Sequence, residues 1–343
     1  MIEGAKGRPV SSSRLSHPLT GHKHSGIFTM EKRKLGASGL EIAPLVLGGN
    51  VFGWTADEAT SLSLIDAFVD QGFDCIDTAD TYSIWVEGHK GGESETIIGK
   101  WLQNRGRRDK LTIATKVGGD MRVKRGLSKE HILASAEASL KRLNTDYIDL
   151  YQAHFDDISV PLEESLEAFG LLQQQGKIRA IGLSNYVAPR VKEALGLARD
   201  KGLPRIGVLQ PHYNLVYRSL FEGDLRNVCE RENLGVIPYY ALAAGFLTGK
   251  YRDVKDLSGS KRAGTVNHYL DPRGLDILSE LDKIAARHNA TPAQVALAWL
   301  LAQPSVTAPI VSATSLKQLE EIVKAVTLKL DLAALGRLDR VSA

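Results

Sequence analysis

Four side chains that together can move a proton stand just after short apolar segments of the chain. A lysine cation near a tyrosine lowers the pKa of the phenol from its ordinary value near 10, and a neighbouring carboxylate holds the ammonium in place. A histidine beside them can donate a hydrogen bond to a negatively charged oxygen. Each residue alone is commonly structural, but the set indicates acid–base chemistry. They are Asp77, Tyr82, Lys116 and His154.

The apolar segments that precede them belong to a repeating pattern. Each is short and apolar without alternation, as in a strand buried on both faces, and a segment of helical periodicity follows it. The predicted strands cover residues 45–47, 73–76, 111–114, 147–151, 178–183, 206–209, 235–238 and 308–311. The predicted helices cover residues 56–69, 94–104, 129–143, 162–175, 189–200, 220–232, 275–288 and 316–326.

Eight strand–helix pairs predict an α/β fold, a single (β/α)8 TIM barrel rather than an open doubly wound sheet. A β-hairpin over residues 32–43 is expected to close the bottom of the barrel. Extra helices are predicted at 291–301, with Thr291 as N-cap in a capping box, and at 332–338. The long connection 241–273 is typical of a lid or binding loop. Because barrel strands end at one face, the fold brings the four polar side chains together.

The composition is that of a globular protein, with 43% hydrophobic and 24% charged residues among 343. Two cysteines, Cys75 and Cys229, are too few for a disulfide framework or a cysteine zinc site, and they fit a reducing compartment. No apolar run reaches the roughly 20 residues of a membrane-spanning helix. We therefore expect a cytoplasmic protein with no metal site.

The positive charge of the chain is confined to its start. Residues 1–29 hold four of the 43 basic residues and one of the 40 acidic ones, which leaves 39 of each in residues 30–343. No clustered basic face is indicated, so we expect neither nucleic acid nor a membrane as partner. Residues 1–29 lack apolar periodicity and predict a disordered N-terminal extension or an added leader, with a transit peptide as the alternative. Residues 30–343 form the predicted barrel.

Familiar nucleotide and hydrolase motifs are missing from the sequence. No G-x-G-x-x-G segment follows a strand, and neither a G-x-S-x-G elbow nor an H-E-x-x-H helix occurs. A bound nucleotide would have to be held without a glycine-rich loop.

From about Lys32 to its C-terminus the chain resembles the aldo-keto reductases, of the bacterial type related to potassium-channel β-subunits. The resemblance rests on Lys34-Leu35-Gly36, the segment 76–82 (IDTADTY), Thr115-Lys116, the segment 182–185 (GLSN) and the segment 247–251 (LTGKY). It implies that Asp77, Tyr82, Lys116 and His154 are the catalytic tetrad of that family. The implied reaction reduces small aldehydes or ketones by hydride transfer from a nicotinamide cofactor, with Tyr82 as the general acid and His154 orienting the carbonyl.

The resemblance also implies a cofactor groove for NADP(H) across the barrel. Residues 184, 185 and 210 would bind the nicotinamide carboxamide, residue 239 would stack on the ring, residues 250 and 262 would cover the pyrophosphate, and residues 312–321 would hold the adenosine end. Near the 2′-phosphate position only Lys317 is basic, and Ile322 replaces an asparagine of many relatives, so NAD(H) stays an alternative. The implied residues are Ser184, Asn185, Gln210, Tyr239, Leu242, Lys250, Arg262, Ser312, Thr314, Gln318 and Glu321. Ser315 and Gln318 also match a helical capping box.

Trp54 and Trp85 are the predicted aromatic wall of the substrate pocket, which Tyr240 narrows, and a short loop after His154 predicts an open site for small carbonyl compounds. One alternative is a Schiff-base aldolase with Lys116 as nucleophile, which requires a lysine that is not ion-paired. Another is a cofactor-binding sensor or auxiliary subunit with little turnover. Relatives of that kind commonly have Asn at the position of His154. We expect a monomer or a weak homo-oligomer.

Overall fold

The computed structural model of the chain describes residues 30–119 and 126–343. The prediction for residues 1–29 lies outside the described residues. Within them, eight strands form one parallel sheet in the order β10-β3-β4-β5-β6-β7-β8-β9. Each predicted strand is present. The strands are β3 (Val46–Gly48), β4 (Cys75–Asp77), β5 (Thr112–Val117), β6 (Ile148–Ala153), β7 (Ile178–Ser184), β8 (Ile206–Gln210), β9 (Gly235–Val236) and β10 (Ile310–Val311).

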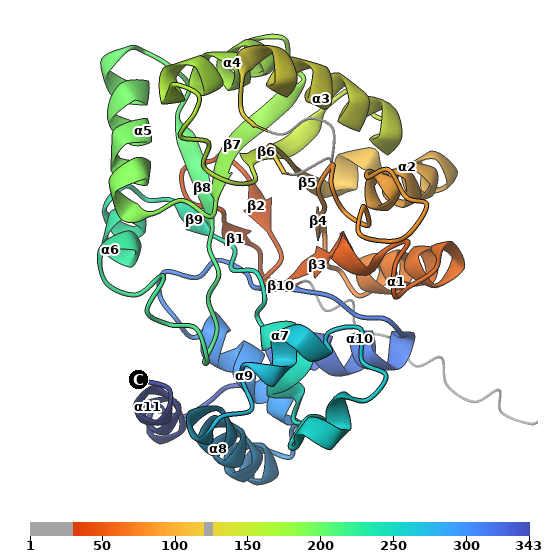
Figure 1. The fold of residues 1–343 in the computed structure, drawn as a ribbon, viewed down its shortest axis with the longest axis vertical. Coiled ribbons are helices and arrows are strands. Elements are labelled where there is room, and N and C mark those ends of the chain that lie inside the picture. Colours follow the sequence, from red (N-terminus) through yellow and green to blue (C-terminus); the bar gives the residue numbers. More distant parts are fainter. Residues whose placement is uncertain (1–29, 120–125) are drawn as a thin grey trace, which may run out of the picture.

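The sheet closes on itself, and helices surround it (Figure 1). The closure lies between β9 and the segment of β10. There the Thr307 N–H donates to the carbonyl oxygen of Val236 at 2.8 Å, and the Ile310 N–H donates to that of Pro238 at 2.9 Å. The predicted (β/α)8 barrel is therefore confirmed.

Local capping explains where the helices begin and end. Ser128 accepts a hydrogen bond from the backbone of His131 at the start of α3, and Asn144 ends that helix in the left-handed region. Helix α6 begins four residues later than predicted because Gly223, with φ 94°, interrupts the helical path. The helices are α1 (Glu58–Asp70), α2 (Glu93–Arg105), α3 (Lys129–Leu143), α4 (Leu162–Gln174), α5 (Ala188–Asp200), α6 (Asp224–Arg231), α7 (Ala263–Asn267), α8 (Pro272–His288), α9 (Pro292–Leu301), α10 (Leu316–Val323) and α11 (Leu332–Val341).

The predicted N-terminal hairpin plugs the end of the barrel at which the strands begin. It consists of β1 (Arg33–Lys34) and β2 (Glu41–Ile42), paired antiparallel. Leu35 and Ile42 are fully buried among apolar residues of the barrel interior. At Gly36 an added Cβ would lie 2.1 Å from the backbone nitrogen of Gly235, so only glycine allows this close approach. The opposite end of the barrel stays open for a site.

The long connection after β9 contains η3 (Ala243–Thr248), η4 (Val254–Leu257) and the short helix α7. It contributes Leu242, Lys250 and Arg262 to the cavity described below. Thr291 caps α9 in the predicted capping box with Gln294. In the described part of the chain, no helix combines the length and apolarity needed to cross a membrane.

Candidate active site

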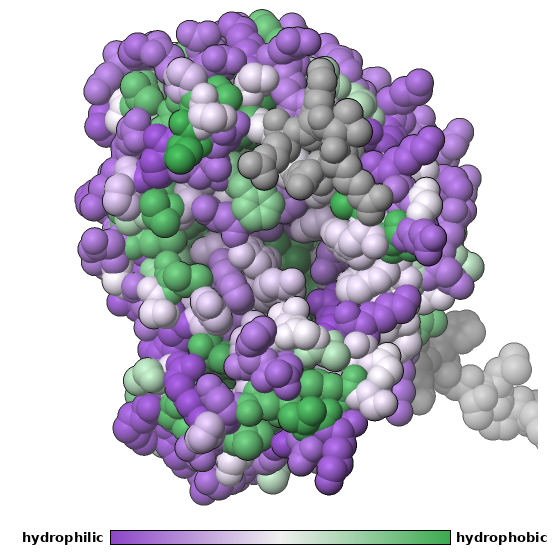
Figure 2. All heavy atoms as spheres, viewed as in Figure 1, coloured by the Kyte–Doolittle hydropathy of each residue, from purple (hydrophilic) through white to green (hydrophobic). Residues whose placement is uncertain are grey.

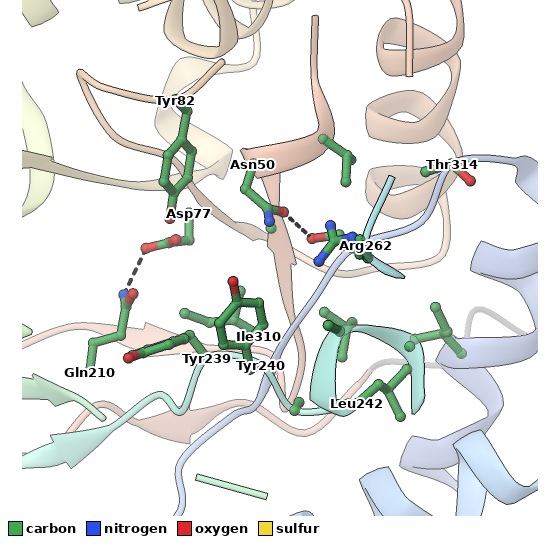
Figure 3. A pocket seen from close by; sticks show the side chains of 18 of the residues that line it. Asn50, Asp77, Tyr82, Gln210, Tyr239, Tyr240, Leu242, Arg262, Ile310 and Thr314 are labelled. Atoms are coloured by element: carbon green, nitrogen blue, oxygen red, sulfur yellow. Dashed lines mark hydrogen bonds between the residues drawn. The ribbon is translucent and has the colours of Figure 1, made fainter. Parts of the chain in front are cut away.

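A cavity of about 760 Å³ opens where the barrel strands end, and the space-filling view shows this face hollowed near its centre (Figure 2). Asp77, Tyr82 and Gln210 lie at one end of it, Thr314 lies at the other, and Arg262 stands between them (Figure 3). The cavity is thus elongated, with the acid–base residues at one end.

Lys116 organises the acid–base end of the cavity. It is fully buried at the end of β5, and its ammonium donates to Asp77 Oδ2 at 2.6 Å, to the Thr78 carbonyl at 2.7 Å and to the Tyr82 hydroxyl at 3.0 Å. These three acceptors use all three of its N–H groups. Burial lowers the pKa of Lys116, but the negative charge of Asp77 and its hydrogen bonds outweigh that effect, so the pKa is raised and the side chain is a cation.

The expectation that Lys116 lowers the pKa of Tyr82 below 10 is wrong for this structure. Burial of the phenol is the larger effect and raises its pKa to about 12, although the Lys116 cation acts in the opposite direction. Tyr82 is therefore a protonated phenol at neutral pH, and its oxygen accepts a hydrogen bond from the Lys116 ammonium. This is the state that a proton donor needs before it reacts.

His154 stands at the end of β6, edge-to-face with Tyr82, with ring centroids 6.0 Å apart. Burial, and then the Lys116 cation, lower its pKa well below 6.5, so the imidazole is neutral at pH 7. Its Nδ1 atom is buried and has no hydrogen-bond partner among the described residues. A neutral imidazole beside the phenol can donate one hydrogen bond to an oxygen bound in the cavity.

The second oxygen of Asp77 is held by two glutamine amides. Gln210 at the end of β8 donates to Asp77 Oδ1 at 2.8 Å, and Gln152 on β6 donates to the same atom at 3.4 Å. Gln152 was not among the residues singled out from the sequence, because it lies inside a strand and no motif marks it. Gly182 makes room for it, since an added Cβ there would lie 2.9 Å from Gln152 Cγ.

Tyr239 forms a platform beside the acid–base end of the cavity. Its hydroxyl donates to Asn185 Oδ1 at 2.6 Å, while Asn185 Nδ2 donates to the His154 carbonyl at 2.8 Å. Behind it lies the ring of His212, with centroids 5.1 Å apart and planes 26° apart. The Ser184 hydroxyl donates a hydrogen bond to the Gln210 carbonyl at 3.0 Å. The ring face of Tyr239 is thus held from two directions.

The far end of the cavity is lined by the residues around α10. Ser312 donates to Asn50 at 2.6 Å, and Gln318 accepts from both the backbone and the hydroxyl of Thr314. Ser315 caps α10 as predicted, but the Gln318 side chain turns to Thr314, so the reciprocal half of the predicted capping box does not form. Glu321 accepts a hydrogen bond from Thr291 at 2.8 Å.

Arg262 is one of two cations, with Lys250, that the long connection contributes to the cavity. Its guanidinium lies 5.3 Å from the ring of Trp54, and it has neither an ion pair nor a side-chain hydrogen bond within residues 30–119 and 126–343. Burial lowers its pKa, although it keeps its charge at neutral pH. A largely buried cation without a carboxylate is suited to an anionic ligand.

The structure brings nearly all the singled-out residues to this one cavity. Lys116 lies just beneath it, within the hydrogen-bond network. Trp54 lies beside it, edge-to-face with Trp85 and facing a second, smaller cavity. The singled-out residues that line the cavity are Asp77, Tyr82, Trp85, His154, Ser184, Asn185, Gln210, Tyr239, Leu242, Lys250, Arg262, Ser312, Thr314, Gln318 and Glu321.

Among the other lining residues, three polar or aromatic side chains escaped the sequence analysis or were given a lesser place in it. Asn50 follows the first barrel strand, so the strand-end rule would have found it. Phe155 is 48% exposed and stacks on His154, and Tyr240 lies with φ 53° next to Tyr239. No cluster of three or more histidine, cysteine or acidic residues able to hold a metal occurs in the described segments.

Comparison with known proteins gives the family of the chain. Residues 44–343 match the Aldo/keto reductase family. Protein tas of Escherichia coli is 34% identical, with 91% of this chain and 97% of that protein aligned. A putative voltage-gated potassium channel subunit beta of Schizosaccharomyces pombe is 36% identical over 86% and 87% of the two chains. L-glyceraldehyde 3-phosphate reductase of E. coli is 32% identical over 86% and 87%. The chain therefore belongs to the aldo/keto reductase family, whose members are oxidoreductases.

Proposed function

We propose that the protein reduces aldehydes or ketones to alcohols with NADP(H) as cofactor and Tyr82 as proton donor. The observation that carries this proposal is the buried network in which Lys116 bonds at once to Asp77 and to the hydroxyl of Tyr82. A family of oxidoreductases and a relative named as a reductase support it.

The cavity fits a nicotinamide dinucleotide. Its elongated form offers an aromatic platform at Tyr239, an unpaired cation at Arg262 above its middle, and polar side chains at its far end. Asn185 and Gln210 have amide groups suited to the carboxamide, and Arg262 suits the pyrophosphate. When bound, this cofactor supplies a hydride to the carbonyl carbon. Lys317 stands on the first turn of α10 as the basic residue for a 2′-phosphate, and on this ground we propose NADP(H).

The residues of the chain supply the proton. As negative charge builds on the carbonyl oxygen, the Tyr82 hydroxyl donates its proton to that oxygen. Lys116 stabilises the phenolate that remains, because its cation lies within hydrogen-bond distance of the phenol oxygen. Asp77 keeps Lys116 charged and in place, and the neutral His154 ring donates a hydrogen bond to the carbonyl oxygen.

The geometry argues against the aldolase alternative. A Schiff-base lysine must present a neutral, free amine. Lys116 instead has a raised pKa and donates to three oxygens. The auxiliary-subunit alternative keeps some support from the relative named as a channel subunit beta. It differs from our proposal in a measurable way, since it requires cofactor binding with little turnover.

The test follows nicotinamide absorbance with NADPH and NADH in turn, and with methylglyoxal, glyceraldehyde and an aromatic aldehyde. We expect wild-type protein to oxidise NADPH in the presence of at least one aldehyde, and to use NADH less well. Tight binding of either cofactor without oxidation would favour the auxiliary-subunit function. Borohydride trapping of a substrate on Lys116 would favour the aldolase.

Aromatic side chains at the mouth of the cavity point to substrates with a flat apolar face. Trp85 is 46% exposed and lies with its ring 6.2 Å from that of Tyr82, and Phe155, which also lines the cavity, stacks on His154. Trp54 supports Trp85 from the side, with centroids 5.5 Å apart. We propose small aldehydes, aromatic ones above all, as the substrates.

We expect Trp85→Ala to raise KM for an aromatic aldehyde about tenfold, because a ring contact of about 1.4 kcal/mol is lost. KM for methylglyoxal, which lacks a ring, should change less than about twofold. Steady-state kinetics of both substrates measure this. Equal changes for the two substrates, or none even when Trp54 is also replaced by Ala, would contradict the aromatic wall.

A further inference from the structure

A second buried polar cluster lies outside the cavity, between the barrel and helices α2 and α3. It is formed by Asp80 from the turn that carries Tyr82, Glu95 from α2 and Tyr151 from β6. Asp80 is 2% exposed, and Glu95 and Tyr151 are fully buried. None of these three side chains takes part in the proposed proton transfer, so the cluster needs its own explanation.

Glu95 has a full set of partners. Its Oε1 accepts from the Thr115 hydroxyl at 2.6 Å, and its Oε2 accepts from Arg142 Nε of α3 at 2.6 Å. Asp80 differs, because its Oδ1 is buried without a hydrogen-bond partner among the described residues. The backbone N–H of Asp80 donates to the Lys116 carbonyl at 3.2 Å, which ties its turn to the end of β5.

Both cations near Asp80 are already paired with other carboxylates. Glu95 faces it from α2, Arg142 from α3, Lys116 from β5, and the Tyr151 phenol lies near it on β6. Arg142 pairs with Glu95, and Lys116 pairs with Asp77. A charged Asp80 would therefore be a buried carboxylate beside a second carboxylate. Burial, with the charge of Glu95 next, raises the pKa of Asp80 to about 8, so it is neutral at pH 7.

We propose that Asp80 is a positioning residue for Tyr82: as a neutral acid it packs the turn of residues 77–82 against β5, and its ionisation beside Glu95 displaces that turn. Only Thr81 separates Asp80 from Tyr82 along the chain. An ionised Asp80 also adds a second negative charge near the Lys116 cation, whose ammonium already donates to Asp77. The consequence is a reduction rate that falls as pH rises through 8. The part of this inference that concerns rate rests on the proposed function.

Tyr82 itself does not explain such a fall, because its pKa of about 12 keeps the phenol protonated at pH 9. Asp80 also affects stability. The unfolded chain releases the Asp80 proton near pH 4, whereas the folded protein keeps it until about pH 8. The unfolded state therefore binds fewer protons between these values, and stability is lost as pH rises from about 4 to 8.

The test compares full-length wild-type protein with Asp80→Asn, which is similar in shape and permanently neutral. The melting temperature of Asp80→Asn relative to wild type should increase by at least roughly 4 °C between pH 5 and pH 8. In wild type, kcat should fall about tenfold between pH 7 and pH 9, and in Asp80→Asn it should fall less than about twofold.

The matched control is Asp74→Asn. Asp74 directly precedes β4, whereas Asp80 follows that strand, and the Asp74 carboxylate pairs with Lys32 at 2.6 Å. In that variant kcat should fall with pH as it does in wild type. Its melting temperature should not increase relative to wild type as pH rises. A pH-independent difference in melting temperature between Asp80→Asn and wild type would overturn the inference, as would an unchanged fall in kcat. The melting experiment is independent of turnover, so it separates failure of this inference from failure of the proposed function.

Carboxyl carbon NMR of wild-type protein labelled on aspartate tests the same point without any variant. One resonance should titrate near pH 8. Titration of every aspartate below pH 6 would contradict the inference even if Asp80→Asn failed to fold.

Discussion

Tyr82→Phe is expected to reduce aldehyde-dependent NADPH oxidation by about a thousandfold, since general acid catalysis contributes roughly 10²–10⁴-fold. The Tyr82 hydroxyl is protonated and accepts a hydrogen bond from the Lys116 ammonium, and phenylalanine keeps the ring while removing only the hydroxyl group. The dissociation constant for NADPH, measured by fluorescence, should change less than about twofold, because the platform and the cations of the groove are untouched.

Tyr147→Phe is the matched control, because that ring is packed between Arg108 and Arg179 near the start of β6, away from the cavity. It should keep wild-type turnover. Tyr82→Phe with turnover within tenfold of wild type would refute the assignment of Tyr82 as the proton donor. Loss of cofactor binding along with turnover would show instead that the substitution disturbs the groove.

Lys116→Met has the second large effect, on both stability and turnover. Methionine fills a similar volume, but Asp77 then stays buried as a carboxylate without its cation, which costs about 3–5 kcal/mol of unfolding free energy. The carbonyl of Thr78 and the hydroxyl of Tyr82 each lose a donor as well. Urea unfolding followed by circular dichroism measures the loss, and turnover should fall by at least about a hundredfold.

The double variant Lys116→Met, Asp77→Asn separates charge from packing. Removing the uncompensated charge should restore part of the lost stability without restoring turnover. A single variant as stable as wild type would contradict the buried ion pair, and a double variant no more stable than the single one would place the loss in packing.

The barrel could be predicted from sequence because its strands are apolar on both faces and short. Strands β9 and β10 have only two residues each, yet the longer apolar runs around them still marked their places. The start of α6 could not be read correctly, because Leu220 and Phe221 extend the apolar pattern ahead of the helix while the backbone at Gly223 does not follow the helical path. Hydrophobic periodicity predicts which residues are buried, but it gives no information on the backbone dihedral angles of a glycine.

The site residues that stand at the ends of strands could be predicted from the sequence. Asp77, Lys116 and His154 all lie there, and the fold brings them together around Tyr82. Gln152 was not predictable, since its amide reaches Asp77 from within β6 and only the register between strands decides that contact. The sequence also could not tell whether the pKa of Tyr82 is raised or lowered. The answer depends on the balance between burial of the phenol, which raises the pKa, and the nearby Lys116 cation, which lowers it. Both are tertiary quantities.

The central claim is that this cavity passes a hydride from a nicotinamide to a carbonyl carbon. The most direct measurement uses NADPH that carries deuterium at both positions of the nicotinamide C4 carbon, an aromatic aldehyde and wild-type protein, followed by mass spectrometry of the alcohol. The account predicts an alcohol that carries one deuterium on its carbinol carbon and forms at the rate of NADPH oxidation. An alcohol without deuterium, or cofactor that binds and is never oxidised, would contradict it.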